Sequence, residues 1–110
     1  MMVPDEWGKD PTVQMMRKVF GRMELAEREV LEETGISMWD PRLRRWREIS
    51  RAAFERAWAS ATRRKMVLGE DQAGALYAHC LARTMMREGI ESARCHHRDE
   101  AIKRLVEEFF

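Results

Sequence analysis

The feature that most constrains the fold of this chain is a pair of helix start signals and a pair of helix stop signals. Asp10-Pro11 and Asp40-Pro41 each place a side-chain acceptor before a proline. Proline suits the first helical position because that position needs no N–H partner. Gly35-Ile36 and Gly89-Ile90 each place glycine at the left-handed position after a helix, followed by an apolar residue that folds back. These signals predict long helices joined by short turns.

The longest helical pattern runs from Asp40 to Lys65 and is also the most one-sided in charge. On a helical projection its apolar side chains form one stripe, and most of its arginines lie outside that stripe. The segment has nine basic and three acidic residues, a charge of +6, so the rest of the chain carries −5 within a net charge of +1. The small net charge therefore conceals a dipolar molecule.

We predict an all-α fold, an antiparallel four-helix bundle built from two helical hairpins, because short turns make neighbouring helices antiparallel. Residues 1–9 are expected to form an N-terminal arm and residues 10–110 a single helical domain. The expected helices span residues 10–34, 40–68, 71–88 and 92–109, with Asp40 and Ser92 as N-caps.

The third predicted helix has apolar or small residues nearly all round in its first half, so it is expected to be the most buried element. In an alternative arrangement this helix continues through Gly89 to the C-terminus as one rod, which would favour an intertwined dimer. No strand pattern is present in the sequence.

The composition indicates a soluble helical protein. The chain is 45% hydrophobic and 35% charged with only three prolines, which is unlike disordered or disulfide-rich secreted chains. The longest run without a charge, Gln72 to Ala82, is far shorter than the ~20 apolar residues of a membrane span. With two cysteines and no recognisable secretory signal, we expect a cytoplasmic protein that does not enter a membrane.

The basic face of the 40–65 segment has two interpretations. In an antiparallel hairpin, glutamates at the end of the first helix would neutralise the Arg42 to Arg47 end of the second. Basic residues beyond that end are then free to bind an acidic protein or the phosphates of a nucleic acid, because neighbouring positive charges sum to a local potential. The predicted partner-binding residues are Arg51, Arg56, Arg63, Arg64, Lys65 and Trp58.

A second group of residues has metal-binding side chains. Zinc and iron are commonly held by imidazole and thiolate groups, but adjacent helical residues diverge by about 100°, so neighbours in sequence rarely share one ion. Buried thiols and ordinary histidines are the simpler interpretation. A helix N-terminus beside Cys95 would alternatively make its thiol reactive by lowering its pKa. The weak metal candidates are His79, Cys80, Cys95, His96, His97 and Glu100.

Nine methionines and four tryptophans exceed what one core of this length must bury, and methionine is favoured at adaptable binding surfaces. The sequence has no glycine-rich phosphate loop, nucleophile elbow or Ser/His/Asp arrangement, so we predict neither an enzyme nor a cofactor. The predicted function is a protein-interaction or adaptor subunit that self-associates or binds an acidic protein through a Met/Trp-rich surface. The alternatives are a nucleic-acid-binding protein that uses the basic face, and a metal-binding or redox thiol protein.

Overall fold

The structure, a computed structural model, describes residues 11–66, 68–96 and 99–110. Within these ranges it contains four α-helices, one 3-10 helix and no strand, which confirms the all-α prediction. No helix in the same ranges has the length and apolar content needed to cross a membrane. The predicted arm, residues 1–9, lies outside the described residues. The elements are α2 (Pro11–Thr34), α3 (Leu43–Arg63), α4 (Glu70–Arg87), the 3-10 helix η1 (Glu91–His96) and α5 (Glu100–Glu107).

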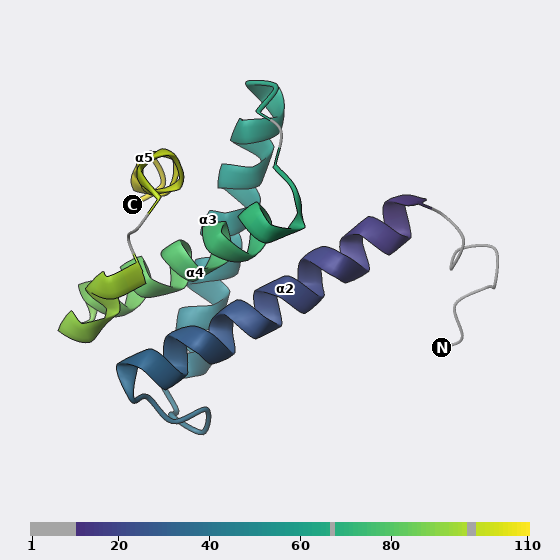
Figure 1. The fold of residues 1–110 in the computed structure, drawn as a ribbon. Coiled ribbons are helices and arrows are strands. Elements are labelled where there is room, and N and C mark those ends of the chain that lie inside the picture. Colours follow the sequence, from purple (N-terminus) through teal and green to yellow (C-terminus); the bar gives the residue numbers. More distant parts are fainter. Residues whose placement is uncertain (1–10, 67, 97–98) are drawn as a thin grey trace.

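Helix α4 lies at the centre of the fold, and α2, α3, η1 and α5 all pack against it (Figure 1). Ten of its 18 residues are buried, which confirms the prediction that the third helical segment is the most buried. Small side chains such as Ala73 and Ala82 let the neighbouring helices approach α4 closely, whereas Leu76, Leu81 and Met85 fill the space between them.

The direction of α2 relative to α4 follows from their contacts. The guanidinium of Arg22 lies 3.5 Å from the carboxylate of Glu70, and the Tyr77 hydroxyl donates to Glu27 at 3.2 Å. Because the residue numbers rise together on both helices, α2 and α4 run parallel. The start of α4 therefore lies beside the middle of α2.

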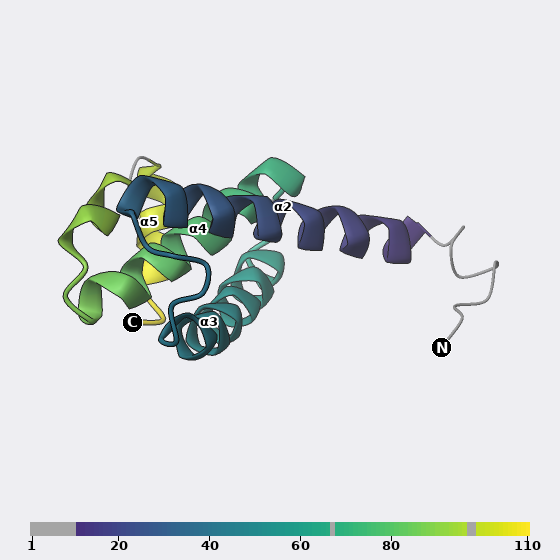
Figure 2. The ribbon, with the colours of Figure 1, turned by 90° about the horizontal axis from the view of Figure 1, so that it is seen from below.

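Helix α3 runs antiparallel to α4. Arg45 pairs with Glu88, and the buried Ser50 hydroxyl donates to Thr84 at 3.1 Å, so the numbers rise on one helix as they fall on the other. After its connection to α2, α3 turns away, so the two helices pack on α4 and not along each other (Figures 1 and 2). The antiparallel bundle of two hairpins stays a prediction.

The two predicted stop signals are confirmed, and a third was missed. Gly35 and Gly89 have φ angles of 72° and 92°, and the residue after each donates its N–H to a carbonyl five positions earlier, at 3.1 and 3.0 Å. Lys65 takes the same left-handed conformation at φ 57°, and Met66 donates to Ala61 at 2.9 Å. Helix α3 therefore ends before the predicted position. The prediction missed this end because a lysine carries no sequence signal for the left-handed conformation.

Asp40 accepts a hydrogen bond from a backbone N–H before α3, as the sequence predicted. The Asp40 carboxylate accepts from the Arg42 N–H at 2.9 Å and from the Arg42 side chain at 3.0 and 2.8 Å. These hydrogen bonds lower the pKa of Asp40 to about 2. The regular helix begins at Leu43, three residues after the predicted cap.

The last predicted helix is divided into two elements. Gly89 ends α4, so the alternative of one continuous rod is wrong. Residues 91–96 form η1, and α5 is capped by Asp99, whose carboxylate accepts from Ala101 and Ile102 at 3.0 and 3.2 Å. The prediction of Ser92 as the cap was wrong, because the Asp99 side chain accepts from free N–H groups at the start of the last helix.

Candidate protein-interaction surface

The first half of α2 projects beyond the rest of the fold (Figures 1 and 2). Arg22 faces the first turn of α4, at 3.5 Å from Glu70 and 3.3 Å from Asp71. Residues before Arg22 therefore lie beyond the point where α4 begins. Helix α2 has 24 residues and α4 has 18, so the longer helix extends past its neighbour.

The projecting half of α2 continues the apolar stripe of the core. Met16, Phe20 and Met23 follow one another at four and three positions, which places them on one face of the helix. Met23 is 5% exposed, whereas Met16 and Phe20 are 51% and 54% exposed. Met16 and Phe20 therefore share a face with the core residue Met23 but remain half exposed. We call these two side chains the α2 docking face.

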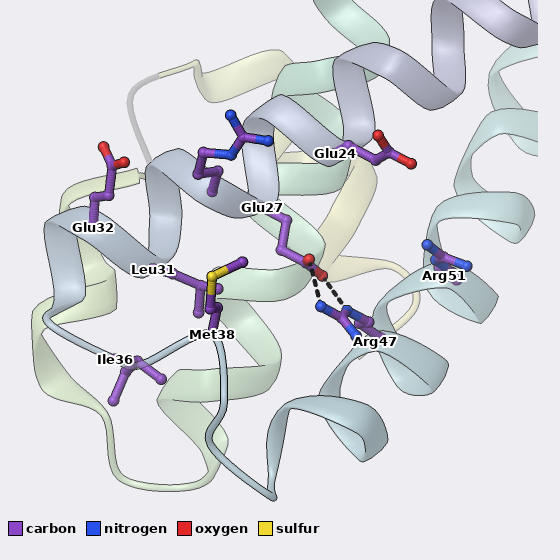
Figure 3. A pocket seen from close by; sticks show the side chains of 9 residues that line it. Glu24, Glu27, Leu31, Glu32, Ile36, Met38, Arg47 and Arg51 are labelled. Atoms are coloured by element: carbon purple, nitrogen blue, oxygen red, sulfur yellow. Dashed lines mark hydrogen bonds and ion pairs between the residues drawn. The ribbon is translucent and has the colours of Figure 1, made fainter.

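An open groove separates the second half of α2 from the first half of α3 (Figure 3). Its volume is about 780 Å³, and its end near the α2–α3 connection is apolar because of Leu31, Ile36 and Met38. We call it the α2/α3 groove. Its remaining lining residues are Glu24, Glu27, Arg28, Glu32, Arg47 and Arg51.

A bidentate ion pair crosses this groove. The Arg47 guanidinium donates to both oxygens of Glu27, at 2.8 and 3.0 Å (Figure 3). The Tyr77 hydroxyl donates to the same carboxylate. Three helices therefore meet at one carboxylate. Burial, and then the negative charge of Glu27, raise the pKa of Tyr77, so its hydroxyl stays protonated and donating. This pair is one case of the neutralisation that the sequence predicted between the first two helices, whereas Arg42 pairs with Asp40 and Arg45 with Glu88 of α4.

The basic residues predicted to bind a partner have different surroundings. Arg51 lies on the α3 wall of the α2/α3 groove (Figure 3). Arg64 makes a two-point ion pair with Glu108, at 2.9 and 2.7 Å, so its charge is already matched within the chain. Arg56 lines a smaller hollow of about 330 Å³ that Phe109 also lines.

The other predicted binding residues lie towards the end of α3. Arg63 and Lys65 are exposed. Trp58 is half-buried, and its ring stacks on Phe54 with 5.7 Å between the ring centroids. Neither the α2/α3 groove nor the hollow beside Arg56 is lined by these three residues. Their role in binding stays a prediction.

Only some of the methionine and tryptophan side chains of the predicted interaction surface are exposed. Met85 and Trp46 are buried, the latter under the Arg42 guanidinium, which lies 4.9 Å from its ring centroid. Trp39 is 86% exposed and, with Met38, occupies the connection between α2 and α3. Trp7 and the side chain of Met15 lie outside the described part of the chain.

The metal candidates are only partly described. Among the described residues, no group of three or more histidine, cysteine, aspartate or glutamate side chains could hold a metal ion. His79 and Cys80 are buried in α4, and burial raises the pKa of the Cys80 thiol to about 12. Glu100 is exposed at the start of α5. The side chains of Cys95 and His96, and all of His97, lie outside the described residues, so the metal site and the reactive Cys95 stay predictions.

Comparison with known proteins gives no family assignment. No family model, no curated protein and no solved structure matches the chain. The function is therefore inferred from the geometry of its own residues.

Sequence reasoning predicted Arg51 as a binding residue, but it missed Phe20 of the α2 docking face and the α2 side of the α2/α3 groove. The signal that could have pointed to them is the distribution of charge along α2. Residues 11–22 contain three basic residues and no acidic one, whereas residues 23–34 contain five glutamates and one arginine. A helix with oppositely charged halves is less typical of one that packs along its whole length within a single chain.

Proposed function

We propose that this protein is a non-enzymatic interaction subunit that binds a helix of a protein partner through the α2 docking face, Met16 and Phe20. The observation that supports this proposal is that the core stripe of α2 continues past the start of α4. Two large apolar side chains at i, i+4 spacing are thereby left half exposed. Burying one such side chain fully contributes about 1.5–3 kcal/mol, so covering both is a substantial driving force.

The α2/α3 groove gives this surface the shape of a helix-binding site. An amphipathic helix typically lays its apolar face into a groove and anchors it at i, i+3, i+4 and i+7 positions. Phe20 precedes Glu24, a lining residue of the groove, by one helical turn. A helix on Phe20 would therefore continue into the groove towards Leu31 and Met38.

The exposed arginines of α3 complete the proposal. Arg51 and Arg63 would orient an acidic partner, since charges at the rim of an interface act mainly on the association rate. The scaffold of this proposal is a helical bundle in which α2 and α3 both pack on α4. The nucleic-acid and metal alternatives have no additional observation in their favour.

The test is the mass of the full chain extracted under mild conditions from the cells that make it. We expect a mass above the 13.0 kDa of one chain, whether the added mass is a second copy or another protein. Phe20→Lys should lower that mass to 13.0 kDa, because the charged side chain cannot be buried in an apolar interface.

The matched control is Leu25→Lys. Leu25 is also an exposed apolar residue of α2, but it lies about 140° around the helix from Phe20. Its substitution should leave the mass unchanged, and both variants should retain the wild-type helical circular dichroism. A wild-type mass of 13.0 kDa, or a larger mass that Phe20→Lys leaves unchanged, would show that the α2 docking face is not an interface.

A further inference from the structure

We propose that the α2 docking face binds a second copy of this chain. In this dimer the first half of each α2 helix packs on the other copy. Each first half lies antiparallel along the second half of the other α2, in the α2/α3 groove, with Arg17 against the Glu24 of the other copy. This inference rests on the proposed function and adds to it the identity of the partner and the register of the contact.

Charge complementarity within α2 supports a second copy as the occupant. The projecting half of the helix is purely basic in its charged residues, and the half that borders the groove is strongly acidic. Antiparallel pairing of two such helices brings each basic half beside an acidic one, whereas parallel pairing would bring like charges together. The basic residues are Arg17, Lys18 and Arg22, and the acidic ones are Glu24, Glu27, Glu29, Glu32 and Glu33.

The positions of three residues give the register. Arg17, Phe20 and Glu24 follow at i, i+3 and i+7, so they lie on one face of α2. A two-fold axis beside Phe20 and Gly21 places Arg17 of each copy opposite Glu24 of the other, and the two Phe20 rings meet at the axis. A Cβ added at Gly21 would have no atom within 4 Å, so this point of the helix is open to a close approach.

Arg17 and Glu24 have the free charges that this contact needs. Within the described ranges, neither side chain has an ion-pair or hydrogen-bond partner. Both are exposed, in contrast to Glu27, whose charge is already matched by Arg47. An antiparallel partner would give two identical ion pairs, one on each side of the two-fold axis.

The dimensions of the groove also fit. Residues 11–20 of α2 form about 15 Å of helix at 1.5 Å per residue, and the groove borders α2 from Glu24 to Glu32, about 13.5 Å. In the proposed register Pro11, the first residue of the incoming helix, lies opposite Val30, two positions before Glu32. The positive end of its dipole then lies near the Glu32 carboxylate, which is favourable.

The experiment uses the purified full chain alone, in sedimentation equilibrium over a range of micromolar concentrations. We expect a mass twice 13.0 kDa for the wild type. Arg17→Glu alone places two glutamate pairs at the interface, and Glu24→Arg alone places two arginine pairs there. Each substitution should raise the dissociation constant of the dimer about tenfold, since each exposed ion pair changes an equilibrium by a few-fold.

The decisive measurement mixes the two variants. One copy with Arg17→Glu and one with Glu24→Arg form two attractive pairs, so the mixture should recover the wild-type dimer, and so should one chain that carries both substitutions. Lys18→Glu is the matched control, because Lys18 lies about 100° around the helix from Arg17. It should leave the dissociation constant within about two-fold of wild type, the change of a weak exposed pair.

The outcomes separate this inference from the proposed function. A chain that is heavier in cells but has a mass of 13.0 kDa when pure would overturn the second copy and leave the interaction surface intact. A dimer that Phe20→Lys dissociates, but that the mixed variants do not restore, would overturn the antiparallel register alone. A dimer that Phe20→Lys does not affect would overturn both proposals.

Discussion

Removing the Glu27 carboxylate should destabilise the fold strongly, because this one group joins three helices. Glu27→Ala leaves the Tyr77 hydroxyl, in a residue only 1% exposed, without its acceptor on α2. A buried polar group without a partner costs about 1–3 kcal/mol. The Arg47 side chain is 39% exposed, so loss of its ion pair adds only about 0.2–1 kcal/mol after solvent screening. The sum is about 1–4 kcal/mol.

The assay is urea unfolding followed by circular dichroism at 222 nm, with the free energy of unfolding extrapolated linearly to water. For a chain of 110 residues, about 4 °C per kcal/mol gives a fall in Tm of about 4–16 °C. Glu29→Ala is the control, because Glu29 is exposed on the same helix without an ion pair in the described part of the chain. It should change stability by less than about 0.5 kcal/mol.

A double-mutant cycle with Tyr77→Phe distinguishes the two contributions. If the hydroxyl left without its acceptor is the main cost, Glu27→Ala should be less destabilising by about 1 kcal/mol or more when Tyr77 is already phenylalanine. Equal losses in the two backgrounds, or a Glu27→Ala loss no larger than that of Glu29→Ala, would refute this account of how α2 is held.

Three further predictions concern single residues. The Cys80 thiol is buried, and its pKa is raised to about 12, so at pH 7 a thiol reagent should label it only as fast as the chain unfolds. The pKa of Asp40 is lowered to about 2 by Arg42, so its stabilisation is full above pH 3.8 and lost as pH falls towards 2; Asp40→Asn should flatten that part of the stability curve measured in urea. Lys65→Gly should stabilise the fold in the same assay by about 0.5–1 kcal/mol, because Lys65 has φ 57°.

Local signals in the sequence predicted the ends of helices well. Gly35 and Gly89 end α2 and α4 because glycine takes positive φ without a steric cost, and the N–H groups that follow satisfy the last carbonyls. The burial of α4 was also predictable, because its apolar surface is too wide for contact with one neighbour. Lys65 has no such signal, because a lysine does not favour the positive φ angle that it takes here.

The candidate site was not predictable in the same way. The apolar stripe through Met16 and Phe20 identifies the inner side of α2 but does not show how far the covering helix extends. That extent depends on the register between α2 and α4, in which Arg22 lies beside Glu70, 48 positions away in the chain. The α2/α3 groove likewise depends on the angle at which α3 leaves α2, which short-range patterns do not specify.

Stability and association should therefore be separable along a single helix. The Glu27 carboxylate binds two other helices and forms part of the groove, so its removal should weaken both folding and the proposed dimer. Arg17 and Glu24 have no partner on another element within the described residues, so reversing their charges should weaken association while the Tm of the monomer stays within a few degrees. If reversal at position 17 or 24 unfolded the chain, these charges would belong to the fold itself, and the division of α2 into a structural half and a docking half would be incorrect.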